Sequence, residues 1–266
     1  MMGKGVVTVV AATVLVLLAV MALVIFLPPF LESQVKSREK DQMEEVRRTF
    51  SILQTSLYQM TQGDSLSFVL PMSPGSFFLY PTGEAACLSL GVKWRENDLG
   101  RLRYSMITRS YPSYTLGLEG GGVVLEQEGV SLMTFPPPLI RAVDLGENRV
   151  RVDVEWVYLV GENVRLSKRG PATLTLICLE EGYSVWAGEN CNAENVVVDL
   201  KGRVEYEGAW QRYLKDLKDD LNSLGLNANL DNQNPLKLTI LGRNASPGVK
   251  DLYYFEHMRK IAVWVA

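Results

Sequence analysis

This chain has few histidines and cysteines, and its positive and negative charges nearly balance. Each of these features excludes a class of protein. Its 266 residues include one histidine and three cysteines. A histidine-rich metal centre is therefore excluded, and three cysteines are too few for a small scaffold held together by disulfide bonds. The 27 lysines and arginines nearly balance the 30 aspartates and glutamates. The net charge of −3 gives no electrostatic reason to expect nucleic acid as the main partner.

The common sequence signatures of catalysis and cofactor binding are missing too. His257 is the one histidine that a serine or cysteine triad could use, and no GxSxG motif offers a nucleophile, so we interpret His257 as an ordinary histidine of a β-sheet. No CxxC pair indicates a zinc site. The glycines at 120–122 are not followed by the Lys-Ser/Thr of a phosphate-binding loop, which favours a turn. We expect no enzyme, and no catalytic, cofactor-binding or metal-binding residues.

One long apolar run stands near the start of the chain. Val6–Leu27 is a run of 22 uncharged residues in which only Thr8 and Thr13 are not apolar. As a helix it would be about 33 Å long, enough to cross the ~30 Å hydrocarbon layer of a membrane. The apolar core of a signal peptide is shorter, and Pro28–Phe30 does not form its small-residue cleavage site. The run therefore predicts a single membrane-spanning helix.

The signals for membrane orientation conflict. Only Lys4 precedes the apolar run, whereas Lys36, Arg38 and Lys40 follow it, which by the positive-inside rule places the rest of the chain in the cytoplasm. The short segment before the run, the β-rich remainder, a sequon at Asn244 and a candidate cysteine pair favour the opposite orientation. We expect an extracytoplasmic C-terminal domain at the cell membrane, against the lysine and arginine count.

An amphipathic helix is predicted over Glu32–Gln62. Its apolar residues recur at alternating steps of three and four, and they form a narrow stripe: Met43, Val46, Phe50, Leu53, Leu57 and Met60. Such a stripe indicates either packing on the chain's own domain or assembly with copies of the same helix, as in a coiled coil. Fewer than three heptads favour the first alternative. We expect Pro28 and Pro29 to kink or break the helix and Gly63 to end it.

After Ser65 the pattern changes to short runs rich in β-branched and aromatic residues between turn signals. The predicted strands are Ser67–Pro71, Ser76–Tyr80, Ala85–Val92, Arg101–Ser110, Tyr114–Glu119, Val123–Glu128, Ser131–Phe135, Arg149–Val160, Ala172–Leu179, Tyr183–Ala187, Asn195–Asp199, Leu236–Leu241 and Lys260–Ala266. Turns are predicted at 97–98, 120–122, 146–148 and 180–182, a polar loop at Asn227–Pro235, and a helix at Gly208–Leu224.

These patterns predict an α+β protein. A long N-terminal helix, transmembrane and then amphipathic, precedes a mostly antiparallel β-sandwich-like domain with one helix from the C-terminal half packed on it. The expected segments are a leader at residues 1–5, a transmembrane helix at 6–27, an amphipathic helical stalk at 28–63 and an extracytoplasmic β-rich domain at 64–266.

Two candidate modification sites remain. Cys178 lies on a predicted strand and Cys191 in the loop after the next strand, so a disulfide across that hairpin is one interpretation and a buried thiol at Cys178 the other. Cys87 is expected to be buried and unpaired. Asn244 begins the triplet Asn-Ala-Ser, a glycosylation acceptor pattern if its loop is external.

Residues Gly3-Lys4-Gly5, the apolar run, the prolines, the amphipathic extension and a following β-domain together resemble an archaeal type IV pilin-like precursor. The resemblance covers residues 1 to about 62. The later part of the chain is similar to archaeal membrane-anchored β-domain proteins at Phe50, Gln54, Leu57, Gly63, Pro74-Gly75, Glu119 to Gly122 and Phe135 to Pro137. Bacterial pilins carry Phe at the first mature position and Glu at the fifth, where this chain has Val6 and Val10.

The resemblance implies that a prepilin peptidase cuts after Gly5, so that Lys4, Gly5 and Val6 form the processing site and Val6 becomes the mature N-terminus. It also implies a helix that is first a membrane anchor and then the core of a filament. We therefore expect a non-enzymatic, pilin-like surface subunit that contacts lipid through residues 6–27 and associates with itself or with related subunits. The alternative is a permanently anchored ectodomain that binds a ligand, an envelope component or a partner protein.

Overall fold

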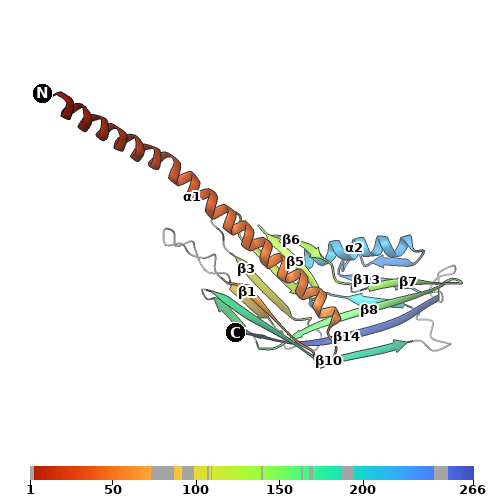
Figure 1. Ribbon diagram of the computed structural model, residues 1–266. Coiled ribbons are helices and arrows are strands. Elements are labelled where there is room, and N and C mark those ends of the chain that lie inside the picture. Colours follow the sequence, from red (N-terminus) through yellow and green to blue (C-terminus); the bar gives the residue numbers. More distant parts are fainter. Residues whose placement is uncertain are drawn as a thin grey trace.

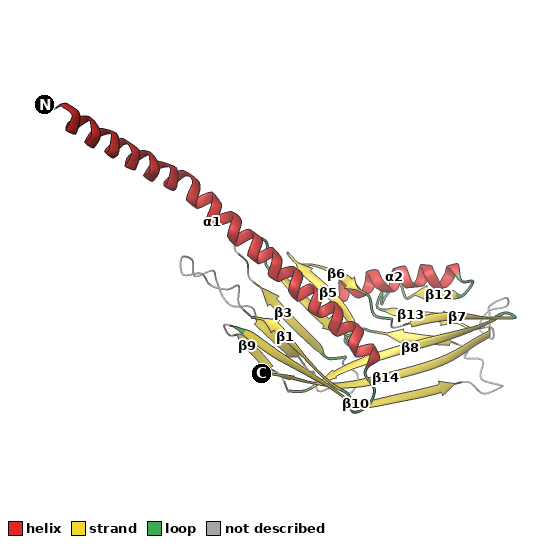
Figure 2. Ribbon diagram, in the orientation of Figure 1, coloured by secondary structure: helices red, strands yellow, loops and turns green. Residues whose placement is uncertain are grey.

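The fold consists of one long helix and a β-rich domain formed around its second half (Figures 1 and 2). The computed structural model describes residues 3–72, 87–91, 99–106, 108, 110–138, 140–162, 164–167, 170–186, 195–242 and 251–266, and the side chains of 13–72 within the first range. Helix α1 spans Gly3–Gln59, and helix α2 spans Glu207–Ser223. The predicted α+β class is confirmed.

The strands form three sheets. The five-stranded sheet has the order β1 (Ser65–Pro71), β10 (Pro171–Trp186), β14 (Asp251–Val265), β8 (Arg149–Val160) and β7 (Ile140–Gly146). The six-stranded sheet has the order β6 (Val130–Phe135), β5 (Gly122–Gln127), β4 (Tyr114–Glu119), β3 (Arg101–Met106), β2 (Cys87–Gly91) and β9 (Val164–Ser167). The three-stranded sheet has the order β11 (Asn195–Asp199), β13 (Lys237–Leu241) and β12 (Asn227–Leu230). Among the described strands, every pairing is antiparallel except that of β14 with β8.

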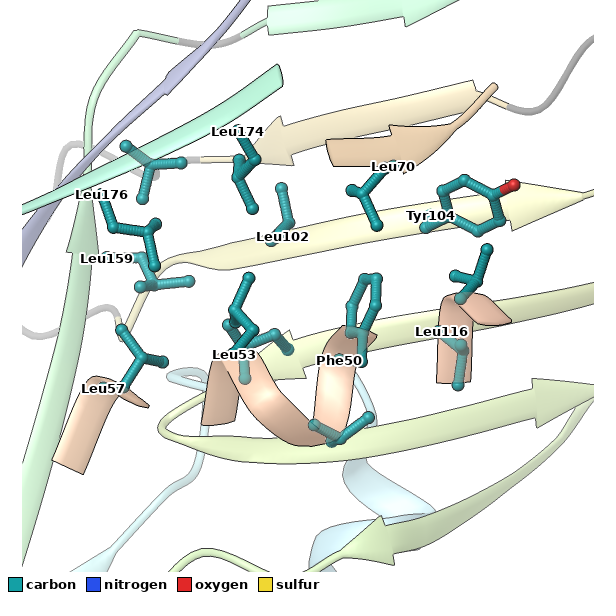
Figure 3. Close-up of a cluster of buried hydrophobic side chains, with 14 of the residues drawn as sticks. Phe50, Leu53, Leu57, Leu70, Leu102, Tyr104, Leu116, Leu159, Leu174 and Leu176 are labelled. Carbon is teal, nitrogen blue, oxygen red and sulfur yellow. The ribbon is translucent and has the colours of Figure 1, made fainter. Parts of the chain in front are cut away.

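The first hydrophobic core lies where the second half of α1 packs between the five-stranded and six-stranded sheets (Figure 3). Phe50, Leu53 and Leu57 are fully buried there. They meet Leu102, Tyr104 and Leu116 of the six-stranded sheet and Leu70, Leu159, Leu174 and Leu176 of the five-stranded sheet. The apolar stripe of α1 thus packs on the chain's own domain. Within the expected stalk at residues 28–63, the second half belongs to this core.

A second core covers the opposite face of the five-stranded sheet. Successive residues of a strand point to opposite faces. In β8, Val150, Val152, Val154 and Trp156 belong to the second core, with α2 and the three-stranded sheet, whereas Val157 and Leu159 belong to the first. One strand therefore contributes to both cores, each over a different half of its length.

Helix α1 does not break at its prolines. It continues through Pro28 and Pro29 as one helix of 57 residues, so of the two predicted outcomes, a kink or a break, the break is wrong. Each proline removes a backbone donor, which leaves the carbonyls of Val24 and Ile25 without their helical partners. The described side chains from Thr13 to Phe30 are all exposed, so the two prolines lie in the part of α1 that does not pack on the β-domain.

Strand β10 also differs from the prediction. The residues Glu180–Gly182 lie inside a continuous strand, and the predicted turn and hairpin there are absent. A bulge between Cys178 and Glu180 absorbs the irregularity, and β14 pairs along both halves of the strand, which keeps its backbone groups bonded.

Other elements follow the sequence pattern closely, with some omissions. Strands β4, β8 and β11 have the predicted bounds. Strands β7, β9 and β12 and the first half of β14 were not predicted, and β12 occupies part of the expected polar loop. The predicted strand Ser76–Tyr80 and the turn at 97–98 lie outside the described residues.

The core position of the α1 stripe is tested by the substitution Leu53→Ala. Because Leu53 is fully buried, we expect the free energy of unfolding to fall by about 2–5 kcal/mol. The matched control is Ile52→Ala, since Ile52 is the preceding residue of the same helix and is 49% exposed. Denaturant unfolding of the full chain in detergent would measure both. Equal losses for the two variants would contradict the packing of α1 between the sheets.

Candidate functional site

The first half of α1 presents an uncovered apolar surface. Every described side chain from Thr13 to Phe30 is exposed, and Val24 and Phe26 reach 67% and 69%. In Figure 1 this half extends away from the β-domain. In the described part of the chain, one helix is long and apolar enough to cross a membrane, and it is α1. Such a helix fits single-pass anchoring.

Contacts between α1 and the β-domain start a short distance along the helix beyond this apolar surface. Glu39 is buried, and one of its carboxylate oxygens accepts a hydrogen bond from the backbone N–H of Ser110 at 3.0 Å. Glu39 lies nine positions after Phe30, which is about 13 Å along the helix. On the outer face the side chains are charged and pair along the helix, as Glu32 does with Lys36 at 3.1 Å. The β-domain would therefore lie close to a membrane that α1 crosses.

The second half of α1 packs against the triglycine turn at residues 120–122, between β4 and β5. The Gln54 side-chain amide lies 2.9 Å from the Gly121 carbonyl oxygen and 3.0 Å from those of Phe135 and Pro136. The Tyr58 hydroxyl donates to the same Gly121 oxygen at 3.1 Å. A Cβ at Gly121, whose φ is +81°, would lie 2.1 Å from the Tyr58 oxygen. Only glycine fits where the helix and the turn come this close.

A buried carboxylate next to this turn holds the start of α2. Glu119 accepts hydrogen bonds from the backbone N–H of Glu205 at 2.7 Å, from that of Tyr206 at 3.4 Å and from the Trp210 indole at 3.0 Å. Burial raises the pKa of Glu119 to about 7, although these three donors act in the opposite direction. The carboxylate therefore ties α2 to the six-stranded sheet at the N-terminal end of the helix.

Four side chains gather beside the C-terminal end of α1, and we call them the His257 cluster: Glu155 of β8, Glu181 of β10, and His257 and Arg259 of β14. The imidazole lies between two carboxylates, with Nδ1 3.2 Å from Glu155 and Nε2 3.1 Å from Glu181. The guanidinium of Arg259 pairs with Glu155 and lies 3.7 Å from Glu181.

The Arg259 side chain also reaches α1 itself. Its Nε donates to the carbonyl of Met60 at 3.1 Å, just past the last helical residue. Burial lowers the pKa of Arg259. Since the last turn of α1 contains no basic residue, Arg259 supplies the cation that favours the negative end of the helix dipole.

The sequence placed His257 in a sheet, which the structure confirms, but it did not indicate the cluster. Glu181 falls within the turn predicted at 180–182, but its side chain is only 13% exposed. The four residues come from three strands that are distant in sequence, and the register of β14 against β8 and β10 is what brings them together. Among the described residues no group of three or more potential ligands could hold a metal ion.

The remaining predicted site residues are placed as follows. Lys4, Gly5 and Val6 lie in the first turns of α1. Cys178 is buried and burial raises the pKa of its thiol, and the hairpin on which its pairing with Cys191 was based is absent. Cys191 and Asn244 lie outside the described residues, so the disulfide and the glycosylation stay predictions. The side chain of Cys87 also lies outside them.

Comparison with protein-family models, curated proteins and solved structures finds no significant match for this chain. What the chain does is therefore inferred from its own residues and geometry.

Replacement of Gly121 tests how closely α1 and the turn fit together. Gly121→Ala should lower the free energy of unfolding by several kcal/mol, because the new methyl group meets Tyr58 and a positive φ is strained for alanine. Gly129→Ala is the matched control, since Gly129 has a similar φ of +79° and nothing within 4 Å. It should cost only about 1 kcal/mol. Denaturant midpoints would measure both, and a Gly121 variant no weaker than the control would contradict the contact.

The pH dependence of unfolding tests the burial of Glu119. Its folded pKa of about 7 lies above the ordinary value of 4.5, so its contribution to stability is fully present below pH 4.5 and is lost as the pH rises through 7. The variant Glu119→Gln has no carboxyl group to titrate there. The difference in unfolding free energy between wild type and variant should therefore shift against the wild type by up to a few kcal/mol between pH 4.5 and 7.5. A constant difference would show that Glu119 is not desolvated.

Proposed function

We propose that this chain is a non-enzymatic, single-pass membrane protein of the cell surface, a pilin-like subunit whose helix α1 anchors it in the membrane and packs with other copies. Residues 6–27 contact lipid in the anchored form, and the β-rich domain lies outside the cytoplasm. The observation that carries the proposal is the division of α1: Thr13–Phe30 is apolar and exposed, whereas Val46–Met60 carries a core of the β-domain.

The apolar side chains on the exposed half of α1 must be shielded from water. Thirteen large apolar side chains are exposed on it: Val14, Leu15, Val16, Leu17, Leu18, Val20, Met21, Leu23, Val24, Ile25, Phe26, Leu27 and Phe30. Full burial of one such side chain contributes roughly 1.5–3 kcal/mol. Exposure of the whole set to water is therefore strongly unfavourable. Either lipid or the same half of neighbouring copies supplies an apolar cover, which is what a subunit that moves from a membrane into an assembly requires.

Contacts between copies would use the exposed half of α1 and not the predicted assembly stripe. Met43 packs against the first core and the other five stripe residues are buried within it, so they are occupied by the chain's own sheets. We therefore propose that copies associate through Thr13–Phe30. Cleavage after Gly5, with Val6 as the mature end, remains part of the proposal and rests on the sequence resemblance.

A permanently anchored ectodomain is the second candidate, and one observation favours it. Beyond Phe30, the outward face of α1 is mainly charged and pairs within the helix, as between Glu32 and Lys36 or Lys40 and Glu44. Such a face suits solvent better than a packed bundle of helices. In this alternative α1 stays in lipid and the β-domain binds a ligand, an envelope component or a partner protein.

Processing separates the two candidates most directly. If the chain is a pilin-like subunit, N-terminal sequencing of the protein extracted from membranes should find Val6 as the first residue. A Gly5→Val variant should keep the unprocessed end, because the bulkier residue blocks the cleavage that the resemblance implies, and it serves as the control. An intact Met1 or Met2 in the wild type would contradict the pilin-like proposal and support the permanent anchor.

Cysteine crosslinking tests the surface through which copies meet. In a chain whose native cysteines are replaced by alanine, Val20→Cys lies on the exposed half of α1 and should form disulfide-linked dimers in the membrane. Leu53→Cys is buried and should stay monomeric, which makes it the matched control on the same helix. Denaturing gels without reductant would show the outcome. Monomers for both variants would contradict self-association through this half.

A further inference from the structure

We propose that an open face of the five-stranded sheet binds an uncharged polysaccharide through the indole of Trp264. The inference names a ligand class for the β-domain, and it rests on the proposed function only for the external location at which such a polymer would be met. Binding by the purified chain depends neither on membrane anchoring nor on cleavage after Gly5, so the two proposals can fail separately.

The strand register places Trp264 on the side of the sheet opposite the first core. Leu174 and Leu176 of β10 and Val263 of β14 are buried in that core. Successive residues of a strand point to opposite faces, so Thr175 lies on the other side of the sheet, and so does its register partner Trp264. The strands concerned lie beside the C-terminal end of the chain (Figure 1).

We call this surface the Trp264 face. It consists of nine residues that pair across β1, β10, β14 and β8 in three rows: Ser67, Thr175 and Trp264; Val69 and Thr173; and Ser65, Ile177, Ala262 and Val160. The second core covers the same side of the sheet farther along β8, at Val154 and Trp156, and includes none of the nine. Trp264 is 51% exposed and Val69 is 62% exposed. The described part of the chain therefore leaves this end of the sheet open.

The chemistry of the Trp264 face matches that of a sugar ring. An indole presents a flat apolar surface, and hydroxyl groups of Ser67, Thr173 and Thr175 lie in its own row and the next one. The hydroxyls of Ser67 and Thr175 are 3.1 Å apart, and their mutual bond uses only one of their two hydrogens. A sugar ring offers a face of C–H groups that packs on an aromatic ring and a rim of hydroxyls that donate and accept.

The lack of charge on this face selects among sugars. None of the nine residues is acidic or basic. An anionic polysaccharide would lose part of the water around its charged groups with no cation opposite, which is unfavourable. The register pair of Glu180 and Lys260 lies beyond the bulge in β10 and carries both signs. An uncharged polymer is therefore the ligand that fits.

A second copy of the chain fits this face less well. A stable interface buries about 800 Å² on each partner and has a mainly apolar centre. Among the nine residues, Trp264 and Val69 are the large apolar side chains that are exposed, and hydroxyl groups lie between them. That is too little apolar surface for the centre of such an interface, whereas one indole is enough to stack on one sugar ring.

Titration calorimetry of the full chain tests the binding. A zwitterionic detergent is required, because maltoside detergents carry sugar rings themselves. The probes are cellohexaose, mannohexaose and chitohexaose, which are uncharged, with hexagalacturonate as the anionic comparison. We expect at least one uncharged probe to bind and the anionic one to bind more weakly. Failure of all three uncharged probes to bind, or equal binding of the anionic one, would overturn the proposal.

Variants of Trp264 assign the binding to this face. Trp264→Ala should weaken the affinity for the bound probe about tenfold or more, since covering roughly 60 Å² of apolar indole surface contributes that much. Trp264→Phe keeps a flat ring and should retain part of the affinity. Val197→Ala is the matched control, because Val197 is also 51% exposed and lies on β11 of the three-stranded sheet. Its affinity should equal that of the wild type.

Two results with these variants would contradict the proposal. Equal affinity of the wild type and Trp264→Ala would place the sugar elsewhere. Sedimentation of the same samples gives the oligomeric state, and a Trp264→Ala variant that loses dimers and keeps its sugar affinity would assign the Trp264 face to a second copy of the chain.

Discussion

The burial of one side of α1 between the five-stranded and six-stranded sheets is the interaction on which the rest of the structure depends. Phe50, Leu53 and Leu57 supply side chains that both sheets contact, and without them the two sheets would face each other across an unfilled space. The helix that carries the apolar half is thus part of the domain's core. The apolar half of α1 is therefore joined to the β-domain by continuous helix, with no flexible linker between them.

Polar contacts fix the helix along its length where apolar packing alone would leave its position undetermined. Gln54 and Tyr58 bond to the carbonyl of Gly121, and Arg259 bonds to the carbonyl just past the helix end. Apolar contacts are non-directional, whereas these hydrogen bonds require one rotation and one axial position of α1. The second core is joined to the first through β8, which contributes opposite faces to each.

Helices α1 and α2 and several of the strands could be predicted from local sequence patterns. The apolar run, the spacing from Met43 to Met60 and the alternation in β8 are periodic signals within a few turns of helix or one strand. The continuity of α1 through Pro28 and Pro29 was not predicted, because a proline inside a helix removes a backbone hydrogen bond and usually kinks or ends the helix. The continuity of β10 through Glu180–Gly182 depends on its pairing with β14, a strand far along the chain.

The sequence by itself determined that the chain begins with a helix able to cross a membrane and continues as an amphipathic helix into a β-rich domain, because hydrophobic periodicity is a property of neighbouring residues. Only the tertiary structure decided that the stripe is occupied by the chain's own sheets. It also decided that the single histidine lies between Glu155 and Glu181 next to the end of α1. The physical reason is that strand register, including the parallel pairing of β14 with β8, arises from contacts between distant segments and has no counterpart in local sequence.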